Sequence, residues 1–126
     1  HRGITIIDDC YNASVPSIKV ALQALGKLVG NKIAVLGDML ELGDKALELH
    51  LSLLEDIERN VDLMVAVGKN MGEVYNNLPE NKRLAQFADI QELLDNMDGL
   101  FHEGDIVLAK GSNGIGLTQF VERIKG

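Results

Sequence analysis

The chain has 126 residues, of which 46% are hydrophobic and 25% charged, so it is long enough to form one domain with a hydrophobic core. Nineteen acidic residues against twelve basic ones give a formal net charge of -7, which repels a phosphate backbone. Aromatic residues make up only 4%, too few for a base-stacking surface. This composition argues against a disordered chain and against a nucleic-acid partner.

Cysteine content and hydropathy indicate the compartment. Cys10 is the single cysteine, so the chain has neither an internal disulfide nor a thiolate zinc cage, as is usual in a reducing cytosol. No apolar run approaches the roughly 20 residues of a membrane span. We therefore expect a cytoplasmic protein without membrane insertion. The chain begins at His1 rather than Met, from which we expect a piece of a longer protein.

Short aliphatic runs alternate along the chain with amphipathic helical patterns, which is typical of parallel strands joined by crossover helices. The first helical pattern has Ser14 as its expected N-cap and Pro16 in its first turn. The pattern predicts a single α/β domain, residues 1–126, with a mostly parallel sheet. The expected strands are 4–7, 32–36, 61–67, 83–87 and 105–109, and the expected helices are 15–28, 44–60, 70–78, 89–97 and 116–125.

Ligands of open parallel sheets bind just beyond the carboxyl ends of the strands, so the residues that follow each strand are the candidates. Asp8 and Asp9 follow the first strand, and two adjacent carboxylates cannot both be buried without partners. In one interpretation, one of them caps the next helix and the other is solvated. In the other, a carboxylate accepts ribose hydroxyls while Tyr11 and Asn12 flank a base.

The second strand leads into a loop bracketed by glycines, residues 37–43, which carries Asp38 and Glu41. Glycine lets such a loop bend tightly and approach a ligand. The two carboxylates suit a cation, an ammonium group or a water-bridged Mg²⁺ better than a bare phosphate. The alternative is an ordinary turn before a helix. The loop lacks the GxGxxG spacing, so a nicotinamide cofactor has no support.

The fifth strand leads into Lys110, Ser112 and Asn113 at the start of a helix. A cation, a hydroxyl, an amide and free backbone N–H groups at that position favour a carboxylate or a phosphate. The segment lacks the order GxxxxGK[ST], so the chain has no visible means of holding a triphosphate alone.

The histidines and the cysteine are weaker candidates for a catalytic or metal-binding role. We expect His50 on a helix surface or half-buried, and not as a catalyst. His1 and His102 have no partner at metal-ligand spacing, so no metal site is assigned. The neighbouring acidic pair raises the pKa of Cys10, which argues against a nucleophilic thiol.

Three segments together resemble the C-terminal domain of the Mur ligases: residues 7–13 (IDDCYNA), 34–43 (AVLGDMLELG, with His50 after it) and 104–112 (GDIVLAKGS). The resemblance covers nearly the whole chain. It implies a Rossmann-like three-layer sandwich, the third domain of an enzyme whose N-terminal and central domains are missing here. It also implies ATP and Mg²⁺, held mainly by the central domain, and the substrates UDP-N-acetylmuramoyl-tripeptide and D-alanyl-D-alanine.

The same resemblance assigns roles to individual residues of this chain. Asp9 would hold the ATP ribose, with Tyr11 and Asn12 near the nucleotide. A second group would form loops that face the reacting groups and the incoming dipeptide: Asp38, Glu41, Lys110, Ser112 and Asn113. The domain would then close over ATP and the dipeptide, and the fragment alone would fold without ligase activity.

A second hypothesis from another class is a stand-alone module, either receiver-like or binding a small molecule. Asp8 and Asp9 would form an acidic Mg²⁺ pocket, with Lys110 opposite them. A receiver also requires an aspartate at the end of its third strand. The chain has Val67 and Gly68 there, so the phosphoacceptor is missing.

Overall fold

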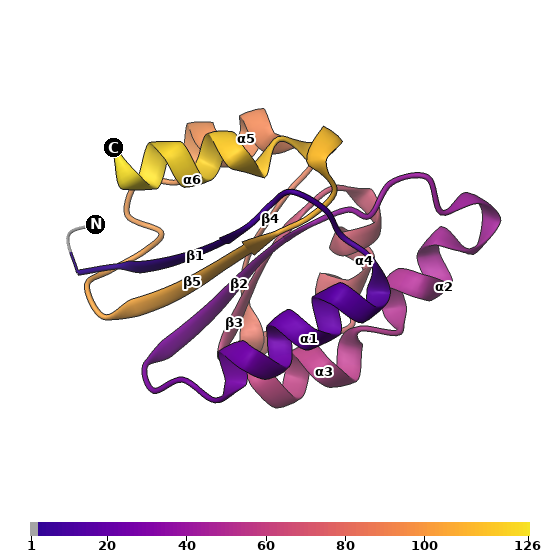
Figure 1. Ribbon diagram of the computed structural model, residues 1–126, viewed down its shortest axis with the longest axis horizontal. Helices are drawn as coiled ribbons and strands as arrows, with labels where there is room; N and C mark the ends of the chain where they lie inside the picture. Colours follow the sequence, from indigo (N-terminus) through magenta and orange to yellow (C-terminus); the bar gives the residue numbers. More distant parts are fainter. Residues whose placement is uncertain (1–2) are drawn as a thin grey trace.

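The computed structural model describes residues 3–126, which are built around a five-stranded sheet. Every strand pair is parallel, and the strand order is β1-β5-β2-β3-β4 (Figure 1). The predicted α/β fold with a parallel sheet is confirmed. The strands are β1 Thr5–Asp9, β2 Asn31–Gly37, β3 Leu63–Val67, β4 Arg83–Phe87 and β5 Asp105–Lys110.

Helices cover both faces of the sheet, which gives the predicted three layers (Figure 1). One face carries α1 (Val15–Gly26), α3 (Leu54–Asn60) and α4 (Lys69–Asn76), and the short α2 (Ala46–Leu51) lies beside α4. The other face carries α5 (Ile90–Asn96) and α6 (Leu117–Lys125). No helix among the described residues has the length and apolar character that a bilayer crossing needs.

Alternation along the strands divides the hydrophobic core into two clusters, because successive strand side chains point to opposite faces. Leu36 faces the α1 layer and packs with Ile18, whereas Val35 faces the α6 layer and packs with Phe120. All four side chains are fully buried. The central strands are apolar on both sides, as parallel sheets covered by helices require.

Local sequence explains where α1 begins. Ser14 is its N-cap, as predicted, and forms a reciprocal capping box with Ser17. The Ser17 N–H donates to Ser14 Oγ at 3.2 Å, and the Ser14 N–H donates to Ser17 Oγ at 2.9 Å. Pro16 lies in the first turn, where its missing N–H breaks no helical bond.

The second predicted helix, 44–60, is wrong as one continuous element. The structure divides it into a 3₁₀ turn at Gly43–Lys45, then α2, then α3. Between α2 and α3 the Leu53 N–H donates to the carbonyl of His50 at 3.0 Å, three residues back, and Ser52 Oγ donates to the Leu49 carbonyl at 2.6 Å. This tighter turn redirects the chain, and helical periodicity does not reveal it. The other predicted boundaries lie within two residues of the observed ones.

The chain leaves β5 in the opposite direction from both of its neighbours in the sheet, β1 and β2. The chain leaves β1 and β2 towards the α1 face, whereas it leaves β5 towards α6 on the opposite face. Such a change of direction between neighbouring parallel strands opens a crevice at their carboxyl ends, where ligands of α/β sheets bind. The carboxyl end of β5 therefore lies at the position where a ligand is expected.

Gly68 provides a test of the packing between β3 and the loop after β2. Its φ is +121°, and an added Cβ would lie 2.5 Å from Asp38 Cγ. We expect Gly68→Ala to lower the free energy of unfolding by about 2–4 kcal/mol, because backbone strain and overlap add together. Urea denaturation measures the change.

Gly99→Ala is the matched control, because Gly99 also has a positive φ, +79°, but has no atom within 4 Å of an added Cβ. Gly99→Ala should lower the free energy of unfolding only by the cost of the backbone strain, about 1–2 kcal/mol. Equal losses in the two variants would contradict the packing described for Asp38.

Candidate functional site

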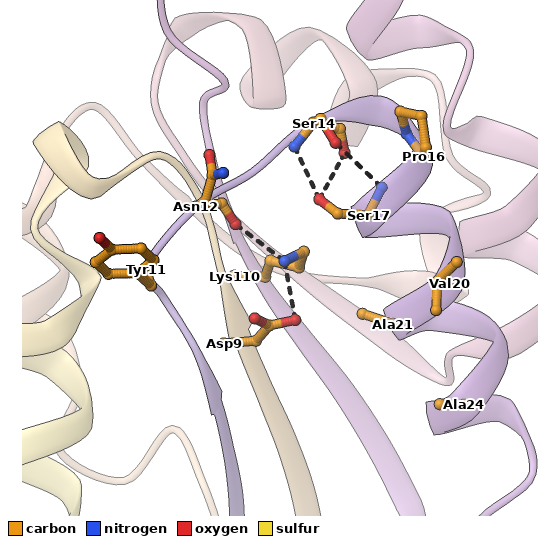
Figure 2. Close-up of a pocket in the computed structure, with 10 residues that line it drawn as sticks. All are labelled: Asp9, Tyr11, Asn12, Ser14, Pro16, Ser17, Val20, Ala21, Ala24 and Lys110. Carbon is orange, nitrogen blue, oxygen red and sulfur yellow. Dashed lines mark hydrogen bonds and ion pairs between the residues drawn. The ribbon is translucent and has the colours of Figure 1, made fainter.

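The end of β1 and the end of β5 are joined by an ion pair. Asp9 and Lys110 are register partners, and Lys110 Nζ donates to Asp9 Oδ2 at 2.8 Å and to the Asn12 carbonyl at 3.0 Å (Figure 2). The Lys110 side chain is only 2% exposed, whereas that of Asp9 is 46% exposed. No hydrogen bond from residues 3–126 reaches Asp9 Oδ1. Asp9 therefore presents one bound and one available carboxylate oxygen.

An open groove of about 590 Å³ lies over this ion pair. Figure 2 shows helix α1 along one side of Lys110 and the Tyr11 ring on the other. The Tyr11 side chain is exposed, and α1 contributes mainly apolar atoms. Such a combination of an apolar wall with few polar groups is typical of small-molecule sites. The lining residues are Asp9, Tyr11, Asn12, Ser14, Pro16, Ser17, Val20, Ala21, Ala24 and Lys110.

Strand alternation separates the two adjacent carboxylates, Asp8 and Asp9. Asp9 lies on the α1 face and reaches the groove, while Asp8 lies one residue earlier and takes the opposite side. Asp8 Oδ1 accepts the Cys10 N–H at 3.3 Å and closes a local turn. Neither carboxylate caps α1, because Ser14 does so, and the interpretation of one as a helix cap is wrong.

Cys10 is buried on the opposite side of β1 from the groove. Its Sγ donates to the Ala109 carbonyl at 3.4 Å. Burial, together with the hydrogen bond and the negative charge of Asp8, raises the pKa of this thiol to about 12. The sequence indicated the acidic neighbour but not burial, which is the larger cause. A protonated, buried thiol is unsuited to nucleophilic chemistry.

Asp38 follows β2, and its carboxylate is directed at helix α4. Oδ1 accepts the Met71 N–H at 2.7 Å and Oδ2 accepts the Asn70 N–H at 3.1 Å. The residue is buried, and the two amides belong to the first turn of α4, where backbone N–H groups have no helical partner. Asp38 thus caps a helix more than 30 residues away in sequence. We predicted that it would face a ligand, but the structure engages both oxygens with backbone amides.

The loops after β2 and β5 are bonded to each other through Ser112. Its Oγ accepts the Leu40 N–H at 2.8 Å, and its N–H donates to the Asp38 carbonyl at 3.2 Å. Glu41, next along the loop, is exposed and has a positive φ of +62°. Asn113 begins the short 3₁₀ turn before α6 and is also exposed. The structure therefore brings Glu41, Ser112 and Asn113 to the same edge of the sheet as Asp9 and Lys110.

His50 is fully buried under the loop after β2, so the expectation of a surface or half-buried histidine is wrong. Its Nε2 lies 2.9 Å from the Met39 N–H, and its Nδ1 lies 2.6 Å from the Ala46 carbonyl. An amide can only donate and a carbonyl can only accept, so these partners require the neutral ring with its proton on Nδ1. The His50 ring therefore holds the loop after β2 through the backbone N–H of Met39.

The described residues do not form a metal centre. Among residues 3–126, no group of three or more His, Cys, Asp and Glu side chains is placed to hold a metal ion. Of the carboxylates considered for Mg²⁺, Asp9 is paired with Lys110 and Asp38 binds two amides. These residues do not fit a Mg²⁺ site. The free oxygen of Asp9 does fit a hydroxyl donor such as a sugar.

Comparison with known proteins identifies the family. The family model described as "Mur ligase, glutamate ligase domain" matches residues 1–113. The chain belongs to the Mur ligase family. It is 34% identical over 119 residues to the UDP-N-acetylmuramoyl-tripeptide--D-alanyl-D-alanine ligase of Rickettsia prowazekii, with 93% of this chain and 26% of the relative covered. The enzyme of the same name from Bacillus subtilis is 33% identical, with 95% and 28% covered.

Solved structures of this family have the same fold. The MurF ligase of Thermotoga maritima in complex with ADP superposes with a TM-score of 0.77 at 28% identity, over 96% of this chain and 28% of that one. A MurF of Acinetobacter baumannii gives a TM-score of 0.83 at 29% identity, over 98% and 28%. The chain spans about a quarter of the length of the relatives it matches.

The contacts of His50 predict different effects for two amide substitutions. Glutamine can place an acceptor oxygen near the position of Nε2, whereas asparagine reaches only the position of Nδ1. We expect His50→Asn to lower the free energy of unfolding by about 1–3 kcal/mol, because the buried Met39 N–H loses its acceptor. His50→Gln should lose less.

Urea denaturation compares the two variants, and the amide resonance of Met39 in ¹H–¹⁵N spectra reports the hydrogen bond directly. That resonance should shift further in His50→Asn than in His50→Gln. Equal losses and equal shifts would show that the ring contributes volume only.

Proposed function

We propose that this chain is the C-terminal domain of an ATP-dependent ligase that joins D-alanyl-D-alanine to UDP-N-acetylmuramoyl-tripeptide in peptidoglycan synthesis. The names of the relatives support this assignment, as does the relative that binds ADP. The observation that carries the proposal is the Asp9 carboxylate, fixed by Lys110 in a groove at the switch point of the sheet. An acidic side chain at that position suits a nucleotide ribose.

In this proposal the nucleotide lies over the groove. A ribose hydroxyl donates to Asp9 Oδ1, and Tyr11 and Asn12 lie beside the nucleotide. The apolar side of α1 excludes water from the same space. The missing central domain supplies the triphosphate and Mg²⁺ contacts, since the residues of this chain do not fit a Mg²⁺ site. The missing N-terminal domain holds the UDP-sugar. The use of ATP and of a UDP-linked substrate supports a cytoplasmic location for the proposed enzyme.

The reaction that we propose has two steps. The peptide carboxylate takes the γ-phosphoryl group of ATP, which releases ADP and forms an acyl phosphate. The amine of D-alanyl-D-alanine then attacks the carbonyl carbon, and the tetrahedral intermediate expels phosphate and loses a proton to give the amide. This domain contributes proximity and exclusion of water, because closure fixes the amine against an intermediate that water would hydrolyse. Glu41, Ser112 and Asn113 lie on the edge that would face the dipeptide.

Two observations weigh against the receiver-like alternative. In the flavodoxin-like order of receivers, 2-1-3-4-5, the first strand lies inside the sheet, whereas β1 here is an edge strand. In addition, β3 ends at Val67 and is followed by Gly68, so the required aspartate is missing. No observation favours a stand-alone small-molecule module over the ligase domain.

The assay uses the full-length protein that contains this chain, with ATP, Mg²⁺, UDP-N-acetylmuramoyl-tripeptide and D-alanyl-D-alanine. We expect phosphate release that depends on the dipeptide, and none from the 126-residue chain alone. Asp9→Asn should raise KM for ATP about tenfold, because a hydrogen bond to a charged acceptor becomes one to a neutral acceptor. KM for the dipeptide should not change.

Asp8→Asn is the matched control, because it removes the neighbouring carboxylate on the other side of β1. Its kinetics should match the unsubstituted enzyme. The proposal fails if the full-length protein releases no phosphate with these substrates, or if the Asp8 and Asp9 variants behave alike.

A further inference from the structure

The ammonium group of Lys110 is bonded to residues at the exit of β1 and not to the loop that follows β5. Its side chain is 2% exposed, and its ammonium group already donates to Asp9 Oδ2 and to the Asn12 carbonyl. Figure 2 shows the ammonium group between these two partners, beneath the groove. The loop that would face the dipeptide begins after it, at Gly111 and Ser112. Lys110 therefore reaches towards the nucleotide side of the site.

The charge of Lys110 has a specific effect on Asp9. The chain carries a formal net charge of -7, and a half-exposed carboxylate beside a polyphosphate would repel it. An ammonium group 2.8 Å from Oδ2 offsets this charge while Oδ1 stays available as an acceptor. The pairing thus permits a carboxylate, which is a strong acceptor for hydroxyl groups, at a site for an anionic ligand.

Lys110 also fixes the geometry of the site. One contact sets the rotamer of the Asp9 side chain, and the other holds the backbone of the loop that carries Tyr11 and Asn12. Both partners belong to the exit of β1, whereas Lys110 ends β5. A single buried side chain therefore keeps the acceptor and the neighbouring loop in one arrangement across the switch point.

We infer that Lys110 is a positioning residue for the sugar of the bound nucleotide, which acts through Asp9 Oδ2 and the Asn12 carbonyl and not through contact with the dipeptide. The inference deepens the proposed function and rests on it. Because Asp9 Oδ1 is held in one orientation, the site should bind nucleotides with ribose more tightly than nucleotides with deoxyribose. Removal of the ammonium group should weaken both nucleotide binding and this discrimination.

The test uses the full-length enzyme with Lys110→Met, Asp9→Asn and the double variant. We expect Lys110→Met to raise KM for ATP about tenfold, because the variant loses a hydrogen bond between charged groups. KM for D-alanyl-D-alanine should not change. The double variant should be no worse than the worse single variant, because residues that act as one unit are not additive. In the unsubstituted enzyme, the preference for ATP is measured once against 2′-deoxy-ATP and once against 3′-deoxy-ATP. The larger of these two preferences should fall in Lys110→Met.

Lys82→Met is the matched control. Lys82 Nζ also donates to a backbone carbonyl, that of Val61, at 2.7 Å, but Lys82 ends the 3₁₀ turn just before β4 and does not line the groove. Its kinetics and its sugar preference should match those of the unsubstituted enzyme. If lysines that donate to a backbone carbonyl had a purely structural role, neither variant would change the sugar preference or the ratio of the two KM values.

The inference is overturned if Lys110→Met raises KM for the dipeptide and leaves KM for ATP unchanged, or if its effect multiplies with that of Asp9→Asn. Where Lys110→Met does not fold, Lys110→Arg keeps the positive charge but alters the contacts with Asp9 Oδ2 and the Asn12 carbonyl. A fall in its preference for ATP over the deoxy nucleotides supports the inference, and an unchanged preference contradicts it. ADP affinity, measured by calorimetry, separates the two proposals. Loss of ADP affinity in Lys110→Met supports the inference even for a protein without ligase activity, and unchanged affinity contradicts it.

Discussion

A buried ammonium group joins the two neighbouring strands that carry the candidate site. Lys110 ends β5 and Asp9 ends β1, and their ion pair crosses the position where the chain leaves the sheet towards opposite faces. A buried charge is costly unless it is paired and hydrogen-bonded, and Lys110 has both a carboxylate and a carbonyl partner. The rest of the site depends on this pair, because it gives Asp9 one orientation and leaves an oxygen for a ligand.

The loop after β2 is held by contacts to three different parts of the chain. Asp38 caps α4, the Met39 N–H donates to His50, and the Leu40 N–H donates to Ser112. Each contact satisfies a backbone N–H group that would otherwise lack a partner. The result is a loop of fixed shape that presents Glu41 at the edge of the sheet. Such preorganisation suits the role that we propose for this domain, which is to place one reactant against another.

Much of the fold follows from local pattern. The strands are predictable because their runs are short and apolar and three of them are followed by Gly or Asp. Ser14 is predictable as a cap from its position before an apolar stripe. Strand alternation also explains why Asp9 and not Asp8 faces the groove, although the sequence analysis left that choice open. Gathering of Asp9 and Lys110 at one edge follows from the parallel sheet, since the carboxyl ends of its strands lie together.

Other features depend on contacts that local pattern does not encode. Asp38 binds amides at the start of α4, and nothing in the loop sequence identifies that distant helix as its partner. His50 is buried beneath the loop after β2, and helical periodicity reveals neither that cover nor the break between α2 and α3. The resemblance to the Mur ligases implies that Lys110 lies near the dipeptide, whereas its side chain points to Asp9. In each case a tertiary hydrogen bond decides the role of a charged or polar group.

The account is tested most directly by a crystal structure of the full-length enzyme with ADP and D-alanyl-D-alanine bound. We predict a ribose hydroxyl within hydrogen-bonding distance of Asp9 Oδ1, with Lys110 Nζ still bound to Oδ2 and out of reach of the dipeptide. A ribose bound elsewhere, or Lys110 in contact with the dipeptide carboxylate, would contradict it.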